Sequence, residues 1–226
     1  MIDGGLNIHH LQFLLIGALW TICLSIIAFV GGGLAGGVIA LARISPVKAV
    51  RWLAIAWIQL IQGTPLLVVL FVCYFGLSIM GLELPGLVAA SIAMIVYVSA
   101  YLGEIWRGCI ESVPRTQWEA AECLALSRAQ RMRLVVLPQA IRIATPPTVG
   151  FMVQIVKNTS LASIVGFVEL VRAGQLINNS IFQPFLVYVL IAVLYFAMCY
   201  PLSVWSRKLE RRLHVGSRTS PSAAEA

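Results

Sequence analysis

Residues 11–42, LQFLLIGALWTICLSIIAFVGGGLAGGVIALA, contain no charged side chain. A helix that crosses the hydrocarbon core of a bilayer needs about 20 consecutive apolar residues, so this stretch is long enough to cross. It is also too long for the apolar core of a secretory signal, and only Asp3 is charged before it. We therefore expect a retained transmembrane helix.

The composition indicates that the rest of the chain also lies in a membrane. Of its 226 residues, 60% are hydrophobic and 11% are charged, whereas soluble domains have about 25% charged residues. Further apolar runs cover residues 52–82, 84–103, 143–166 and 173–206, and Lys157 interrupts the third of these. The sequence predicts an all-α integral membrane protein with five transmembrane helices, at approximately residues 11–42, 52–79, 85–108, 143–166 and 182–206.

The basic residues gather on one side of these spans. Apart from Lys157 and Arg172, they lie between the first and second spans, between the third and fourth, and after the fifth. Because Lys and Arg are enriched in cytoplasmic loops, we expect an external N-terminus and a cytoplasmic C-terminus. Topology and contact with anionic lipid then explain the net charge of +7, so we expect no nucleic-acid partner. The small, polar residues 214–226 are predicted to be a disordered tail.

The loop between the third and fourth spans, residues 115–138, is charged and must face water. Pro114 ends the preceding span, and Thr116–Glu119 and Ser127–Gln130 each have the spacing of a capping box. This pattern predicts one short helix from residue 117 to about 125, and a second that ends near residue 136, before Pro138. No nucleophile–base pair and no metal-ligand spacing recurs in the aqueous loops, so we expect no catalytic residue and no metal site.

Glu119-Ala120-Ala121, followed by Leu137-Pro138-Gln139-Ala140, resembles the EAA loop in the membrane-spanning subunits of bacterial ABC importers. Within that superfamily the chain is similar to the polar amino acid permeases of the histidine, glutamine and glutamate group. Other matching segments are QGTPLL at residues 62–67, AYLGEIWRG at 100–108, SVP at 112–114 and KNTSL at 157–161. The order and spacing of these segments make the resemblance specific, and it covers about residues 11–213.

The resemblance implies a type 1 ABC-importer transmembrane domain over residues 11–213, in the bacterial inner membrane, that moves polar amino acids. It implies a periplasmic binding protein, a second permease subunit, identical or different, and two cytoplasmic ATPase subunits. The chain itself has no G-x-x-x-x-G-K sequence, so we expect ATP and Mg²⁺ on those subunits and no cofactor on this chain. An ion-coupled secondary carrier, a membrane-embedded scaffold subunit and a membrane enzyme are the alternatives. A carrier usually shows an internal repeat, which is not visible here.

The resemblance also assigns coupling to residues of the charged loop, namely Glu119, Ala120, Ala121, Ala125 and Leu126. The alanines would permit close approach to the ATPase, and the Glu119 carboxylate would either contact it or cap its own helix. Ala125 stands where the family usually has glycine. If this position is left-handed, alanine costs about 1 kcal/mol relative to glycine.

Three sets of residues inside the membrane have predicted roles. A stripe of small residues is expected to pack against another helix: Ala28, Gly32, Gly36 and Ala40. Glu104 and Arg107 are three residues apart and can pair, either as a local ion pair or near substrate. A polar set either lines a transport route or forms interhelical hydrogen bonds: Gln59, Gln62, Thr64, Gln154, Lys157 and Asn158. With Glu104 as the only intramembrane carboxylate and paired, cationic amino acids should pass less readily than neutral or acidic ones.

Overall fold

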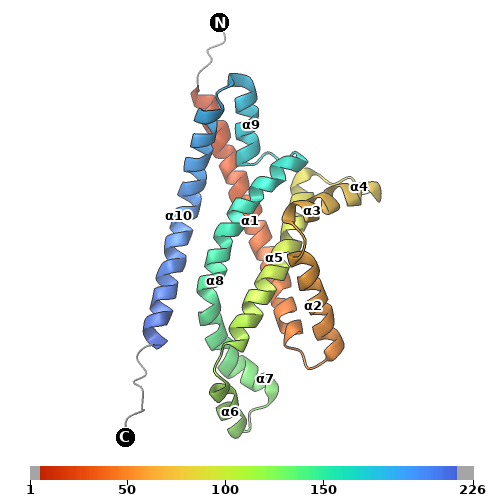
Figure 1. Ribbon diagram of the computed structural model, residues 1–226, viewed down its shortest axis with the longest axis vertical. Coiled ribbons are helices and arrows are strands. Elements are labelled where there is room, and N and C mark those ends of the chain that lie inside the picture. The colour runs from red at the N-terminus through yellow and green to blue at the C-terminus, as the bar shows by residue number, and fades with distance from the viewer. Residues whose placement is uncertain (1–5, 218–226) are drawn as a thin grey trace.

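The computed structural model describes residues 6–217, which fold into a bundle of helices (Figure 1). Three of its long apolar helices are α1 (Ile8–Arg43), α5 (Gly86–Glu111) and α10 (Pro184–Ser217). A fourth, residues 128–165, is built from α7 (Arg128–Gln130), a π-helical segment (Arg131–Val136), α8 (Leu137–Asn158) and a 3₁₀ segment (Thr159–Val165). Each is long and apolar enough to cross a membrane, so the all-α prediction is confirmed. Of the predicted tail, residues 218–226 lie outside the described residues.

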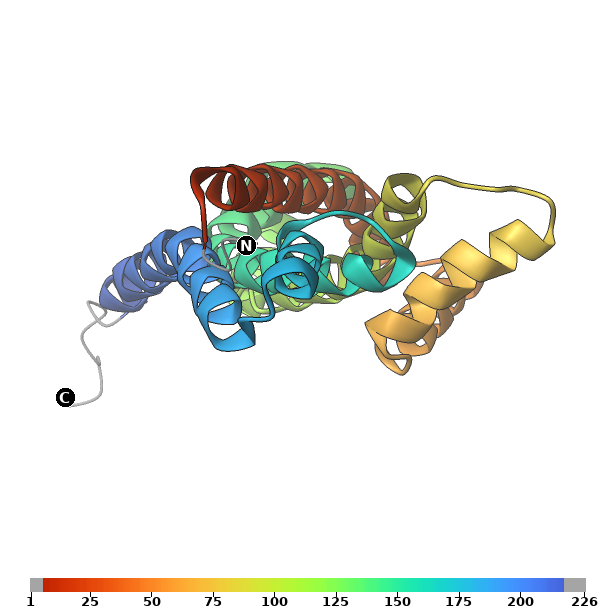
Figure 2. The same cartoon turned by 90° about the horizontal axis from the view of Figure 1, so that it is seen from above.

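The apolar run predicted as the second span is broken in two. α2 (Lys48–Gln62) meets a second helix at 101°, and this second helix comprises α3 (Leu66–Phe71), a π-helical segment (Val72–Gly76) and α4 (Leu77–Ile79). The break falls at Gly63-Thr64-Pro65, because proline has no N–H and disfavours helical geometry in the residue before it. Figure 2 shows the resulting arm projecting from the side of the bundle. With this pair counted as one span, the described residues hold five.

The last apolar run is also divided. α9 (Leu170–Ile181) is a separate short helix packed against the first half of α1, and it ends at Phe182, whose φ of 53° is left-handed. Pro184 then begins α10, since proline is well tolerated at the first position of a helix. The predicted span 182–206 lies almost entirely within α10.

The loop helix predicted to end before Pro138 instead continues into the membrane. The π-helical segment leads directly into α8, and Pro138 sits in the first turn of α8, where a missing N–H is tolerated. α8 also passes through Pro146 and Pro147. The hydroxyl of Ser206 on α10 donates to the carbonyl oxygen of Pro146 at 3.0 Å. This bond ties α10 to α8 beside the two prolines.

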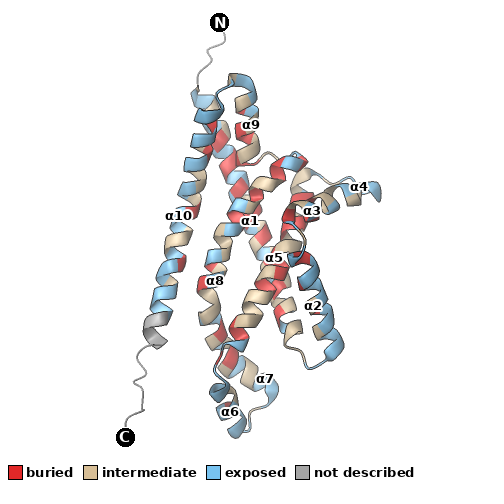
Figure 3. Cartoon of the chain, in the orientation of Figure 1, coloured by how far each residue is buried: buried red, intermediate tan, exposed pale blue. Residues whose placement is uncertain are grey.

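The small-residue stripe of α1 lies against α5. Ala28, Gly32, Gly36 and Ala40 are all buried. A Cβ atom added to Gly32 would lie 2.4 Å from Cγ1 of Val98, and one added to Gly36 would lie 3.1 Å from the backbone nitrogen of Gly103. Close backbone approach of this kind is how small residues favour helix association in lipid. By contrast, α10 and the outer face of α2 are largely exposed in the single chain (Figure 3).

Candidate functional site

The charged loop forms a compact cap on one end of the bundle, which we call the basic end. A small apolar cluster fixes it there, with Ile110 and Val113 from the end of α5 and Val136 and Ala140 from the start of α8. Trp118 and Met132 from the loop itself pack on this cluster. The loop is therefore held rigidly relative to the two spanning helices that it joins.

α6 (Arg115–Cys123) is the exposed helix of this loop, and it begins two residues earlier than predicted. Pro114 occupies its N-cap position, so Thr116 lies inside the first turn and the expected Thr116–Glu119 capping box does not form. That prediction is wrong, because Pro114 starts the helix before the threonine is reached. The second box does form: Ser127 N donates to Gln130 Oε1 at 2.9 Å, and Gln130 N to Ser127 Oγ at 3.4 Å.

The two faces of α6 differ in what they present. Ala121 is only 2% exposed and packs inward against the chain itself, so it acts through packing. Glu119 and Ala120 face water. The neighbouring Glu122 pairs with Arg131 at 2.9 Å, whereas Glu119 has no hydrogen bond or ion pair within residues 6–217. Since Glu119 does not cap its own helix, its carboxylate is free to contact a partner.

Ala125 closes α6 in the left-handed conformation, with φ of 55°. Its N–H donates to the carbonyl of Glu122 at 2.9 Å, and the N–H of Leu126 donates to that of Ala121 at 3.2 Å. This pair of bonds is the Schellman arrangement, in which glycine is the usual residue at the left-handed position. Ala125 therefore has the left-handed backbone conformation that is strained for alanine.

We expect Ala125→Gly to stabilise α6, because glycine adopts a positive φ without steric cost. The gain of about 1 kcal/mol should slow amide hydrogen exchange in residues 115–123 about fivefold. Ala120→Gly, within the same helix, is the matched control and should accelerate exchange by a similar factor. Equal exchange in Ala125→Gly and the wild-type chain would show that the left-handed turn does not limit the helix.

Glu104 lies at the centre of an ion network near the basic end. Arg107 pairs with it at 2.6 Å, which confirms the predicted pair, and Arg43 from the end of α1 approaches it at 3.4 Å. Arg107 also pairs with Glu111. Two cations thus share the Glu104 carboxylate. The network joins α1 to α5, which favours the local ion pair over a substrate contact.

The polar set within the membrane does not converge into one cluster in the single chain. Gln154 Nε2 donates to Asn158 Oδ1 at 3.0 Å, and Thr64 Oγ1 donates to the carbonyl of Leu60 at 2.7 Å. Gln59, Gln62 and Lys157 are exposed, and no acidic partner of Lys157 occurs in the described part of the chain. An exposed lysine in a spanning helix must meet another subunit or water, because lipid contact is costly.

Aromatic side chains line the same region. Tyr97 and Tyr101 of α5 have ring centroids 4.4 Å apart, and Tyr101 stacks on Phe151 of α8 at 5.5 Å with the planes at 13°. Tyr97 and Tyr101 lie on α5, and Phe151 lies on α8. Gln154 and Asn158 follow Phe151 on α8 by about one and two turns. We use the name polar face for Gln154, Asn158 and these three rings.

Glu169 is a buried carboxylate that sequence reasoning missed, so Glu104 is not the only acid in the apolar part of the molecule. It is fully buried and caps α9 by accepting from the N–H groups of Val171 and Arg172, each at 2.9 Å. Tyr195 of α10 donates to it at 3.0 Å and Thr21 of α1 at 3.5 Å. Burial raises the pKa of Glu169, while these four donors act in the opposite direction. A signal was present in the sequence, because Glu169 directly precedes an amphipathic helix.

We expect Glu169→Ala to lower the free energy of unfolding by about 3 kcal/mol, because it removes a helix cap and leaves buried donors unpaired. Glu169→Gln can keep the acceptor oxygen that receives the bonds of Val171, Tyr195 and Thr21 and loses only the bond from Arg172, so it should cost less than half as much. Thermal unfolding in detergent would measure both, with exposed Glu83→Gln as the control. Equal losses in the alanine and glutamine variants would show that the negative charge, and not acceptor geometry, holds the cap.

The sequence of this chain is similar to those of known transport proteins. Residues 28–215 match the family model described as binding-protein-dependent transport system inner membrane component. A probable amino-acid ABC transporter permease of Bacillus subtilis (strain 168), YckA, is 36% identical over 92% of this chain and 92% of its own length. A probable glutamine ABC transporter permease of the same organism, GlnM, is 37% identical over 85% of this chain and 89% of its own.

A solved structure gives the same result for the fold. A crystal structure of an amino acid ABC transporter with histidines contains a chain that superposes with a TM-score of 0.86 at 34% identity. The match covers 91% of this chain and 96% of that chain. The chain therefore belongs to the family of inner membrane components of binding-protein-dependent transport systems, the multi-pass permease subunits of ABC importers.

Proposed function

We propose that this permease subunit carries polar amino acids inward across the bacterial inner membrane, driven by ATP hydrolysed in partner subunits. Helix α6 supports this proposal most strongly. It is held by packing at the end of a bundle of the importer family, it faces water, and the side chain of its Glu119 is unpaired within residues 6–217. The names of the relatives support amino acids as the substrate class.

The orientation follows from charge. The loop of residues 115–138 and the adjoining ends of α1, α2, α5, α8 and α10 hold all of the Lys and Arg residues of the described chain except Lys157 and Arg172. The positive-inside rule makes this end cytoplasmic and the N-terminus external. α9 and the α3–α4 arm then lie towards the periplasmic side, where a binding protein would deliver substrate.

We expect a reporter that is active only outside the cytoplasm to work when fused at Met1 or inserted at Gly81, and to fail after His214. Gly81 is exposed with φ of 86° and lies in a turn, so an insertion there disturbs little packing. Fusions at all three positions in intact cells provide the measurement. Activity only after His214 would invert the orientation.

Coupling to the ATPase is assigned to the exposed side of α6. Glu119 and Ala120 would touch the partner, while Ala121, Ala125 and Leu126 would hold the helix in shape from beneath and at its end. Two ATPase subunits and a second permease, identical or different, would complete the transporter. The second permease would cover the polar face and the exposed Gln59 and Gln62, which would place these groups along a shared route.

Co-purification tests this assembly directly. The tagged chain should retain an ATPase subunit in detergent, and the chain alone should hydrolyse no ATP. Glu119→Lys should lose the ATPase subunit, whereas Glu83→Lys, which changes an exposed acid near the other end of the bundle, should keep it. Retention of no ATPase by the wild-type chain, together with uptake driven by an ion gradient, would favour a secondary carrier.

A further inference from the structure

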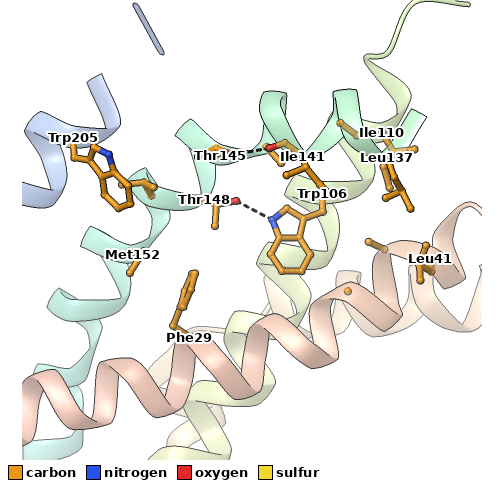
Figure 4. A pocket seen from close by; sticks show the side chains of 15 residues that line it. Phe29, Leu41, Trp106, Ile110, Leu137, Ile141, Thr145, Thr148, Met152 and Trp205 are labelled. Carbon is orange, nitrogen blue, oxygen red and sulfur yellow. Dashed lines mark hydrogen bonds between the residues drawn. The ribbon is translucent and has the colours of Figure 1, made fainter. Parts of the chain in front are cut away.

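An apolar groove of about 620 Å³ lies between α1, α5, α8 and α10 (Figure 4). Trp106, Thr148 and Met152 line its middle, Phe29 of α1 closes one side, and Trp205 of α10 stands at the other. A second cavity of about 340 Å³ shares Phe29 and Met152 with the first. The two cavities are therefore adjacent along α1.

The groove offers an amino acid few polar groups, namely the indole N–H of Trp205 and two threonine hydroxyls. Its hydroxyl groups are already satisfied within the chain: Thr145 Oγ1 donates to the carbonyl of Ile141 at 2.7 Å, and Thr148 Oγ1 accepts from Trp106 Nε1 at 2.9 Å. Its other lining side chains are hydrocarbon, aromatic or thioether. Burial of a zwitterion without hydrogen-bond partners is very costly, so the groove suits a hydrocarbon ligand.

The groove also faces away from the polar face. Thr145, Thr148 and Met152 recur at helical spacing along one side of α8. Gln154 follows Met152 by two residues, which places it on roughly the opposite side, about 200° around the helix. The groove is thus separate from the surface assigned to transport.

Unpaired cations stand at its basic end. Arg142 lies one turn before Pro146 on α8, and Arg207 and Lys208 directly follow Ser206 on α10. The Ser206–Pro146 hydrogen bond therefore brings all three to a similar depth. All three are exposed and have no ion pair or hydrogen bond among residues 6–217.

Three other cations near the basic end are neutralised within the chain. Arg43, Arg107 and Arg131 each pair with a glutamate. Glu210 is the one acid in the described part of α10, and it has no ion pair there. Trp205, 50% exposed, lies beside the cations at the groove rim, as tryptophan does at the depth of lipid headgroups.

We propose that this groove binds an anionic phospholipid, with an acyl chain lying along Phe29 and Met152 and the phosphate held by Arg142 and by Lys208, which lies on the same side of α10 as Trp205. Basic pockets between transmembrane helices on the cytoplasmic side recognise anionic headgroups in this way. The ligand is distinct from the transported substrate. In the orientation proposed above, it comes from the inner leaflet.

Native mass spectrometry of the detergent-purified full chain, titrated with phosphatidylglycerol or phosphatidylcholine, tests the headgroup contacts. Each cation near an anionic headgroup contributes about fivefold to affinity, so Arg142→Gln/Lys208→Gln should weaken the first phosphatidylglycerol about 30-fold. It should leave phosphatidylcholine unchanged. Lys48→Gln/Arg51→Gln removes the same charge from the α2 side of the basic end and should weaken phosphatidylglycerol less than threefold. Equal effects of the two double variants would overturn the proposal, since they would indicate general electrostatic attraction.

Filling the groove tests the acyl-chain contact. Ala144 lines the groove, so Ala144→Phe should displace the tightly bound lipid, whereas Leu53→Phe on the exposed face of α2 should not. A photoreactive residue at Ile141 should form adducts with phospholipid. An adduct with a second polypeptide would instead show that protein covers the groove and would overturn the proposal. The double glutamine variant changes only exposed side chains, so the headgroup test stands even if Ala144→Phe does not fold.

Discussion

Replacement of Gly32 by valine is expected to lower the free energy of unfolding by about 3 kcal/mol and to separate α1 from α5. The added Cβ would lie 2.4 Å from Cγ1 and 2.5 Å from Cβ of Val98, and 3.2 Å from the carbonyl oxygen of Ile95. These are contacts of Cβ itself, so no rotation of the side chain relieves them, and the two methyl groups of valine add further bulk. Thermal unfolding in detergent, followed by circular dichroism, measures the loss.

Two further variants test whether contact with Val98 causes this loss of stability. A Cβ at Gly33 would meet only ordinary contacts, the nearest at 3.6 Å from Trp106, so Gly33→Ala should be neutral or stabilising. Val98→Gly removes the atoms that oppose Gly32→Ala, so the double variant should recover part of the stability lost in Gly32→Ala alone. Additive losses in the double variant would show that Val98 does not limit the approach of α1 to α5.

Glu119→Lys is expected to reduce ATP-driven uptake tenfold or more while the chain still inserts and folds. If the carboxylate meets a cation of the ATPase, reversal places like charges together at a cost of several kcal/mol, and about 1.4 kcal/mol already corresponds to tenfold. Thermal stability should be unchanged, because the Glu119 side chain makes no hydrogen bond or ion pair within residues 6–217. Uptake into membrane vesicles and thermal unfolding of the same preparations provide the two measurements.

Glu210→Lys is the matched control, because it reverses an exposed acid on α10, outside both α6 and the periplasmic side. It should transport at the wild-type rate. Wild-type uptake by Glu119→Lys would remove the coupling role from this residue, and equal losses in both variants would indicate a general effect of charge on insertion.

Much of the fold could be predicted because lipid imposes simple requirements. A run such as residues 11–42 must form a helix in a bilayer, since every backbone polar group needs an internal partner. The Ser127–Gln130 capping box and the Glu104–Arg107 pair depend on residues three apart, so local sequence was enough to find them. The strain at Ala125 was also visible as an alanine in a glycine position.

The errors came from competition between neighbouring signals. Pro114 starts α6 before Thr116 can cap it, and Pro138 enters the first turn of a helix instead of ending one. The Gly63-Thr64-Pro65 break lies inside an apolar run, where hydropathy alone gives no boundary. The partners of Glu169, Thr21 and Tyr195, are distant in sequence, so only the assembled fold brings them to it. The apolar groove likewise forms only where α1, α5, α8 and α10 pack together, so the sequence alone did not predict it.

Uptake of labelled glutamine into proteoliposomes would show whether this chain is the permease of an ATP-driven importer. The vesicles would contain this chain with its second permease and ATPase subunits, with the binding protein outside and ATP inside. We expect uptake that requires both ATP and the binding protein, and that unlabelled glutamine or glutamate inhibits more strongly than arginine. Uptake that persists without the ATPase subunits under an imposed ion gradient would contradict it.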